Sequence, residues 1–117
     1  MHHGNGSEEI FHDDPRVMLC STFQHPFYPY CGADSANEHI INVPLQRGAD
    51  SPAFRNAVTE QWLPALAMFE PEMIFVSAGF DAHHDDDMAQ LDLDDEDYVW
   101  ITRQIRMIAE KYAHGRI

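Results

Sequence analysis

Histidine and aspartate side chains gather in two short stretches of this 117-residue sequence. His2 and His3 follow the first methionine, and Asp81 follows the apolar run SAGF and precedes a His-His pair and three aspartates. A carboxylate that leaves a buried strand can be held rigidly, and carboxylate oxygen with imidazole nitrogen is a ligand set that zinc accepts. The chemistry that these residues suggest is metal binding.

Each stretch also has a simpler interpretation. An aspartate after a strand often caps a helix or turns the chain, and His83 and His84 with Asp85 to Asp87 are typical of a solvated turn rather than of ligands. Met-His-His followed by Gly, Asn, Gly and Ser is also how many vector-derived leaders read. Residue types alone leave both interpretations open.

The excess of acidic over basic residues limits which kinds of molecule the chain can bind. The chain has 7 Lys plus Arg against 20 Asp plus Glu, a formal net charge of −13. Such a surface repels phosphate backbones, so direct nucleic-acid binding is not expected. Eight of the twenty acids lie in DDDMAQLDLDDED, between Asp85 and Asp97. We interpret this run as a solvated loop and helix start, with attraction of cationic substrates as the alternative.

Length and cysteine content indicate one compact domain in a reducing compartment. No stretch approaches the roughly 18 to 20 consecutive apolar residues of a membrane span, and no signal peptide opens the chain. Cys20 and Cys31 are too few for a disulfide framework and are not spaced as a C-x-x-C pair. We therefore expect reduced thiols, a cytoplasmic protein and no membrane partner.

Three apolar runs predict the strands that must position these residues. They cover Arg16–Phe23, His39–Leu45 and Glu72–Phe80, with centres at 40–43 and 73–79 for the second and third. The third run is apolar on both faces, as a buried parallel strand is. We expect all three strands to lie parallel in one sheet.

Two apolar stripes at helical spacing predict helices after the second and third strands. The first begins at Ser51 as N-cap with Pro52 in the first turn, and Pro71 ends it, with a kink at Pro64. The second begins at Asp94 and ends at Gly115. Strands alternating with helices favour an α/β fold with a parallel sheet, in which ligands bind in loops beyond the carboxyl ends of the strands.

Several segments resemble, in order and spacing, the zinc-dependent histone deacetylase family. The resemblance is closest to its bacterial class II-like members, the acetylpolyamine amidohydrolases and acetoin-utilisation-type proteins. The segments are HHGNG, EEIFHDDPRV, HPFYPYCGAD, INVPL, WLPAL and VSAGFDAHHDDDMAQL. They continue in family register through Ile10 and Phe11, which a tag leader would not do. The resemblance implies the arginase-deacetylase three-layer fold, with residues 1–117 as a central part of the catalytic domain and its N- and C-terminal parts missing.

The resemblance also implies the metal site. In the family, zinc is held by an Asp and a His two residues apart in a D-x-H-H-G motif and by a second Asp after a later strand. His2 takes the place of the histidine ligand and Asp81 that of the second carboxylate. The first carboxylate is expected two residues before His2, which is before Met1. His3 is expected to support the metal site from nearby rather than to bind the ion.

Further positions follow from the same resemblance. Tyr28, with Phe27 beside it, takes the place of the aromatic wall that flanks the extended acyl-amine chain above the metal. Ordinary loop packing is the alternative for both rings. Some members bind a monovalent cation such as K⁺ near the zinc, and Ser21 takes one such position. Phe23 stands where relatives often have a histidine, so the resemblance at this cation site is weaker than elsewhere.

The resemblance implies that the full enzyme hydrolyses an N-acetyl amine, either acetyl-lysine or an acetylated polyamine. The histidines that transfer protons and the Gly-Gly-Tyr tyrosine that supports the oxyanion are absent from these 117 residues, so we expect no catalytic residue and no activity in the isolated chain. Two alternatives stay open: a non-catalytic module that binds an acetylated partner or serves as a structural piece, and an inactive truncated product. The oligomeric state is not predicted.

Overall fold

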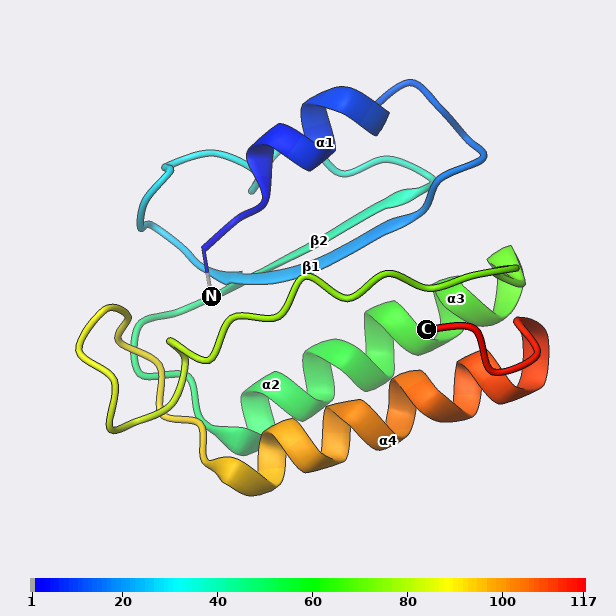
Figure 1. Cartoon of the computed structure of the whole chain (residues 1–117). Helices are drawn as coiled ribbons and strands as arrows, with labels where there is room; N and C mark the ends of the chain where they lie inside the picture. Colours follow the sequence, from blue (N-terminus) through cyan, green and yellow to red (C-terminus); the bar gives the residue numbers. More distant parts are fainter. Residues whose placement is uncertain (1) are drawn as a thin grey trace.

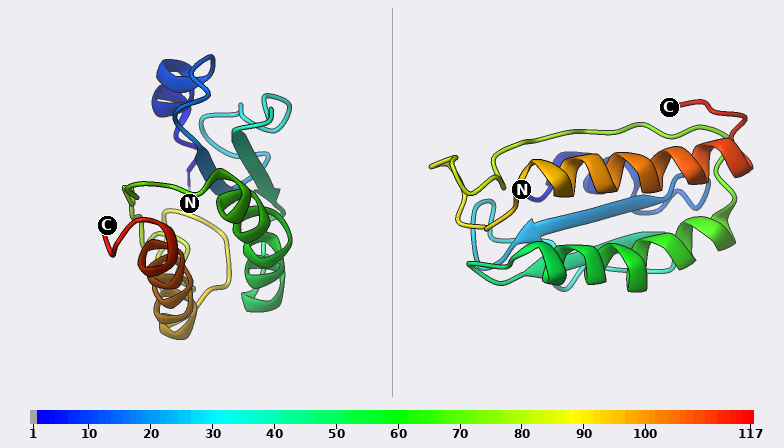
Figure 2. Two further views of the ribbon diagram at one scale, coloured as in Figure 1. Left: turned by 90° about the vertical axis from the view of Figure 1, so that its right-hand side faces the viewer. Right: turned by 90° about the horizontal axis from the view of Figure 1, so that it is seen from below.

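The computed structural model describes residues 2–117, which fold into helical layers around a small parallel sheet. In chain order the elements are α1 (Asn5–Phe11), β1 (Leu19–Gln24), β2 (Ile40–Leu45), α2 (Ser51–Ala57), the π-helical turn η1 (Val58–Trp62), α3 (Leu63–Phe69) and α4 (Asp95–Tyr112). Helix α1 lies on one side of the sheet, and α2, α3 and α4 lie on the other (Figures 1 and 2). The predicted α/β class, with helices flanking a parallel sheet, is confirmed.

Strands β1 and β2 form the sheet and pair in parallel register from Leu19 with Ile40 to Gln24 with Leu45. Both strands were expected from their apolar and β-branched residues, although β1 starts three residues later than the predicted Arg16. Among residues 2–117, no helix combines the length and apolar character that a bilayer span requires.

The predicted third strand is wrong as a strand. Residues 73–80 run extended past the sheet and α4 (Figures 1 and 2), but they join no ladder within residues 2–117. At the start of the segment, the Ile74 N–H donates a hydrogen bond to the Arg116 carbonyl at 3.1 Å. The side chain of Phe75 is 87% exposed. An apolar run predicts burial, but a strand forms only where a neighbouring backbone supplies hydrogen bonds.

The helix after β2 starts one residue earlier than predicted and is interrupted. Asp50, not Ser51, is the N-cap, because its carboxylate accepts the Ala53 N–H. The expected disturbance near Pro64 takes the form of the π-helical turn η1, directly before α3. Proline has no N–H for the carbonyl one turn earlier, so the regular bonding pattern fails there. Glu70, with a left-handed backbone, ends α3 just before Pro71.

Helix α4 follows the predicted signals closely. Asp94 is the N-cap, and its reciprocal bonds with Asp97 form a capping box. Gly115 (φ +76°) ends the helix by donating its N–H to the Ala109 carbonyl at 2.9 Å. The carboxylate of Asp97 also accepts hydrogen bonds from Ser51 Oγ at 2.6 Å and Arg55 Nε at 2.7 Å. The N-termini of α2 and α4 are therefore tied together.

The main core lies between the end of β2, the α2–η1 helix and the loop that precedes α4. Its buried members are Leu45, Phe54, Ala57, Val58, Ala82, Leu91 and Leu93. Two of them, Ala82 and Leu93, flank the stretch that carries the second His-His pair. The core therefore reaches directly to the predicted metal-binding residue Asp81.

Candidate metal centre

The structure brings His2 and Asp81 together, although they lie far apart in the sequence. His2 Nδ1 lies 2.8 Å from Asp81 Oδ2, and both side chains are partly exposed. The expected contact between them is confirmed. Their role as metal ligands stays a prediction.

Asp81 is held in place by the residue on each side of it. Ala82 is buried in the main core, and its carbonyl accepts the Leu93 N–H at 3.2 Å. The Phe80 carbonyl accepts a hydrogen bond from the Tyr98 hydroxyl at 3.0 Å. Helix α4 and the core therefore fix the backbone of Asp81 without help from a strand ladder.

Two glutamines connect the end of β1 to the loop after Asp81. The buried side chain of Gln24 accepts the Gln90 N–H at 2.9 Å and donates to Gln90 Oε1 at 3.3 Å. The Gln90 carbonyl in turn accepts the Gly48 N–H at 2.7 Å, beyond the end of β2. Neither glutamine was predicted from the sequence; the available signal was a polar residue that ends an apolar strand.

His3, the residue after His2, belongs to a buried polar cluster. Its Nε2 is 3.0 Å from Glu8 Oε2, and its ring centroid is 4.5 Å from that of Phe23. Glu8 Oε2 accepts a hydrogen bond from Asn42 Nδ2 at 2.6 Å. The cluster joins the N-terminal segment, α1 and β2. The support of the metal site by His3 stays a prediction, and Glu8 and Asn42 were not predicted from the sequence.

Gly32 leaves the space that the His3 ring occupies. A Cβ placed on Gly32 would lie 2.5 Å from the His3 ring, and the backbone of Gly32 has φ +94°. Only glycine suits both conditions. The Gly32 carbonyl also accepts a hydrogen bond from Asn42 Nδ2 at 2.9 Å, so this loop belongs to the same cluster.

The two predicted channel aromatics both lie beside His2. The ring centroids of Phe27 and Tyr28 are 5.3 Å and 6.0 Å from that of His2, and Tyr28 is 66% exposed. An exposed aromatic ring next to the His2–Asp81 pair offers an apolar surface to a ligand. Ser21 lies apart from the strand ends, half-buried in the middle of β1 and opposite Asn42 in the ladder.

The His2–Asp81 pair fits the chemistry of zinc. An imidazole nitrogen and a carboxylate oxygen face each other at 2.8 Å, and two ligands of a tetrahedral zinc stand about 3.3 Å apart given bonds of about 2.0 Å. The two atoms would need to move apart by only about half an ångström to bind the ion between them. The ionised carboxylate is the form that binds metal.

Comparison with known proteins gives the family. The family described as "Histone deacetylase domain" matches residues 1–117. An uncharacterised protein of Synechocystis is 38% identical over 93% of this chain and 37% of its own length. A histone deacetylase-like amidohydrolase of Pseudomonas aeruginosa is 35% identical, over all of this chain and 33% of its own.

The structural comparison agrees. The crystal structure of an acetylpolyamine aminohydrolase from Burkholderia pseudomallei superposes with a TM-score of 0.82 and 31% identity, covering 90% of this chain and 33% of that one. The chain thus spans about a third of the length of these relatives. The fold is that of the arginase-deacetylase class, and with the family match extending over residues 1–117, the chain belongs to the histone deacetylase family.

Proposed function

We propose that this chain is part of a zinc-dependent deacetylase that hydrolyses N-acetyl amide bonds. The observation that carries the proposal is the contact of His2 Nδ1 with Asp81 Oδ2 at 2.8 Å, between two residues at the family's ligand positions. The relatives include proteins described as an amidohydrolase and an acetylpolyamine aminohydrolase. The substrate class is an acetylated amine, either acetyl-lysine in a protein or an acetylated polyamine.

In this proposal, His2 Nδ1 and Asp81 Oδ2 hold the zinc, together with the carboxylate that the family places two residues before His2. When bound, zinc lowers the pKa of water to about 7 and polarises the acyl oxygen. Asp81 contributes a fixed negative charge, because the core and Tyr98 hold its backbone. His3 supports His2 from the buried cluster with Glu8. A monovalent cation such as K⁺ beside Ser21 belongs to the proposal on the resemblance alone.

Phe27 and Tyr28 form one wall of the substrate channel in this proposal. Their rings flank His2, where they would pack along the methylene chain of an acylated amine and shield the carbonyl from water. Proton transfer and oxyanion support belong to the histidines and the tyrosine that the family has outside these 117 residues. We therefore propose that the isolated chain does not turn over substrate.

We also propose a cytoplasmic location. Cys20 and Cys31 are both free thiols, as expected in a reducing compartment. Burial raises the pKa of the Cys20 thiol to about 12, so this cysteine is not a nucleophile at neutral pH.

The test is to measure zinc content and hydrolysis of an acetyl-lysine peptide and an acetylated polyamine in parallel. The 117-residue chain should bind one zinc weakly at this pair, should lose that zinc when either His2 or Asp81 is replaced, and should show no turnover. A chain extended at both ends to include the family's D-x, His-His and Gly-Gly-Tyr segments should hydrolyse at least one substrate. In it, Asp81→Ala should remove the zinc bound at this centre, and the activity with it.

The matched control is Asp87→Ala, which removes an exposed carboxylate from the same loop and should leave zinc content unchanged. Turnover by the 117-residue chain alone, or an active extended Asp81→Ala enzyme, would refute the assignment.

A further inference from the structure

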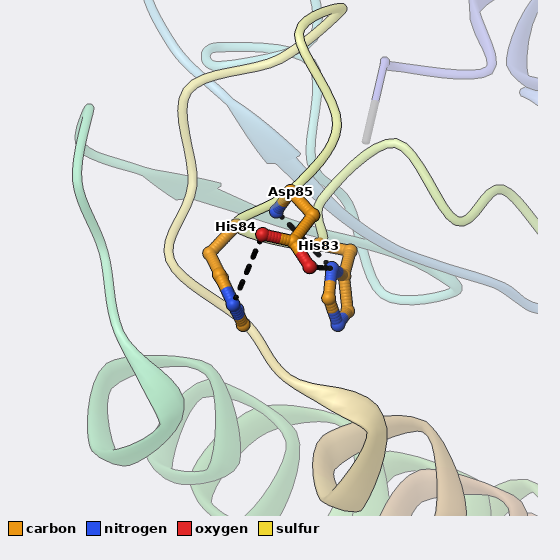
Figure 3. Close-up of side chains that lie close together, drawn as sticks. All are labelled: His83, His84 and Asp85. Carbon is orange, nitrogen blue, oxygen red and sulfur yellow. Dashed lines mark hydrogen bonds and ion pairs between the residues drawn. The ribbon is translucent and has the colours of Figure 1, made fainter.

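A second group of metal-ligating side chains lies on the turn after Asp81. His83, His84 and Asp85 each offer one ligand atom, and these atoms all lie within 4.8 Å of one another (Figure 3). Neither His2 nor Asp81 belongs to this group. The sequence is typical of a solvated turn here, and the structure shows a turn whose side chains converge.

The distances within the group are close to those of a bound ion. His84 Nε2 lies 3.4 Å from Asp85 Oδ1, and His83 Nδ1 lies 4.0 Å from Asp85 Oδ2. The two imidazole rings stack with centroids 4.4 Å apart. Ligands of a tetrahedral ion with bonds of about 2.0 Å stand about 3.3 Å apart. Changes of at most about 1.5 Å in these separations would therefore complete the coordination.

The ring of His84 is oriented as a metal ligand is. Its Nδ1 lies 3.1 Å from the Leu93 carbonyl, which can only accept a hydrogen bond, so Nδ1 carries the hydrogen. In the neutral ring, Nε2 then directs its lone pair toward Asp85 Oδ1. An imidazole lone pair and a carboxylate oxygen that face each other at 3.4 Å can share a metal ion, just as they can share a proton. Histidines that bind metal commonly donate their other N–H to a backbone carbonyl in this way.

The ring of His83 is also held by its surroundings. It stacks against Tyr98 of α4, and its Nε2 lies 3.5 Å from Asp95 Oδ1. Its Nδ1 accepts the Asp85 N–H at 3.1 Å, so coordination would exchange this one hydrogen bond for a metal bond. The acidic run around the group, within a chain of net charge −13, raises the local concentration of cations.

We propose that His83, His84 and Asp85 form a second site for a divalent transition metal, with water completing the coordination. Two imidazole nitrogens and one carboxylate oxygen suit Zn²⁺, Ni²⁺ or Cu²⁺, whereas Mg²⁺ and Ca²⁺ prefer oxygen ligands alone. Because the site uses none of the residues of the proposed catalytic centre, it stands independently of the deacetylase proposal. An ion there would fix the turn that directly follows Asp81.

The test uses zinc titration of the full chain by calorimetry in an Asp81→Asn background, which removes the first site. We expect one bound zinc, an affinity that falls at least about tenfold in His84→Ala, and no competition from excess Mg²⁺. His12→Ala is the matched control: His12 forms an exposed pair with Asp13 at 3.1 Å that includes no second imidazole. This control should leave the zinc affinity unchanged.

Histidine ring NMR resonances provide a second measurement, which needs no substitution at His83, His84 or Asp85. Zinc should shift the resonances of His83 and His84 in the Asp81→Asn chain and leave those of His12 in place. The proposal is overturned by unshifted His83 and His84 resonances at millimolar zinc. Equal zinc affinity with and without His84 would also overturn it, as would an equal loss in the His12→Ala control.

Discussion

Residues 73–80 and residues 81–93 are consecutive, yet the first part lies in solvent and the second is anchored. Phe75 and Val76 in the first part are exposed. In the second part, Ala82, Leu91 and Leu93 are buried in the main core, and Gln90 is bonded to Gln24. The more apolar of the two stretches is therefore the less buried. The position of Asp81 depends on the anchored residues after it, not on the extended segment before it.

The strongest test of this comparison is to truncate one apolar side chain in each part. Leu93→Ala should lower the free energy of unfolding by about 2–5 kcal/mol, because it opens a cavity in the core. Phe75→Ala should change it by less than about 0.5 kcal/mol, because this side chain already contacts water. Urea unfolding followed by circular dichroism measures both. Equal losses would mean that residues 73–80 are buried in solution, by self-association or otherwise.

This contrast also shows which elements of the fold could be predicted from the sequence. Strands β1 and β2 and helix α4 were predictable, because β-branched runs and the Asp94–Asp97 capping box act locally. The third strand was not, because pairing depends on a backbone elsewhere. Helix α1 was missed, since its sequence NGSEEIF has no apolar period that predicts a helix.

The candidate site shows the same division. The contact between His2 and Asp81 was expected from the resemblance to a family and could not come from spacing, because they lie far apart in the chain. The cluster of His3, Glu8 and Asn42 was missed for the same reason: three separate segments supply it. Long-range polar contacts leave no periodic signal in a sequence.

A smaller effect is expected in the loop that packs on His3. Gly32→Ala should destabilise the chain by about 2–4 kcal/mol, because its Cβ meets the His3 ring and its backbone has positive φ. Gly48→Ala is the control: it shares the positive φ but has open space around its Cβ, so about 1–2 kcal/mol is expected. Thermal or urea unfolding of both variants isolates the clash. If the two substitutions cost the same, the close packing of Gly32 on His3 is wrong.

The link between α2 and α4 should depend on pH. Burial alone would raise the pKa of Asp97, but hydrogen bonds from Ser51, Arg55 and the Asp94 backbone lower it below the ordinary 3.8. A lowered native pKa stabilises the fold fully above the ordinary value, and the contribution is lost as the pH falls below it. Asp97→Asn should cost about 1–3 kcal/mol at pH 7 and should flatten the decline in unfolding free energy below about pH 4.

Urea titrations at several pH values between about 2 and 7 would measure this dependence. The control is Asp95→Asn, since the Asp95 side chain is 97% exposed and lies in the same helical turn. A decline below pH 4 that is equally steep in the Asp97→Asn chain would show that other carboxylates cause it.

The smallest expected effect lies at the boundary between the exposed and the anchored part. Tyr98→Phe removes the hydrogen bond to the Phe80 carbonyl and should cost about 0.5–1.5 kcal/mol. Burial first, and the charge of Asp81 second, raise the pKa of Tyr98, so its hydroxyl keeps the proton that it donates.

Losing the bond from Tyr98 to the Phe80 carbonyl should also free the backbone of Asp81. Hydrogen exchange at the His83 amide, which donates to the same Phe80 carbonyl at 3.1 Å, should become faster while the centre of α4 stays protected. Tyr112→Phe, at the far end of α4, should change neither. Uniformly faster exchange along α4 in the Tyr98→Phe chain would instead mean that Tyr98 stabilises the whole fold and does not specifically position Asp81.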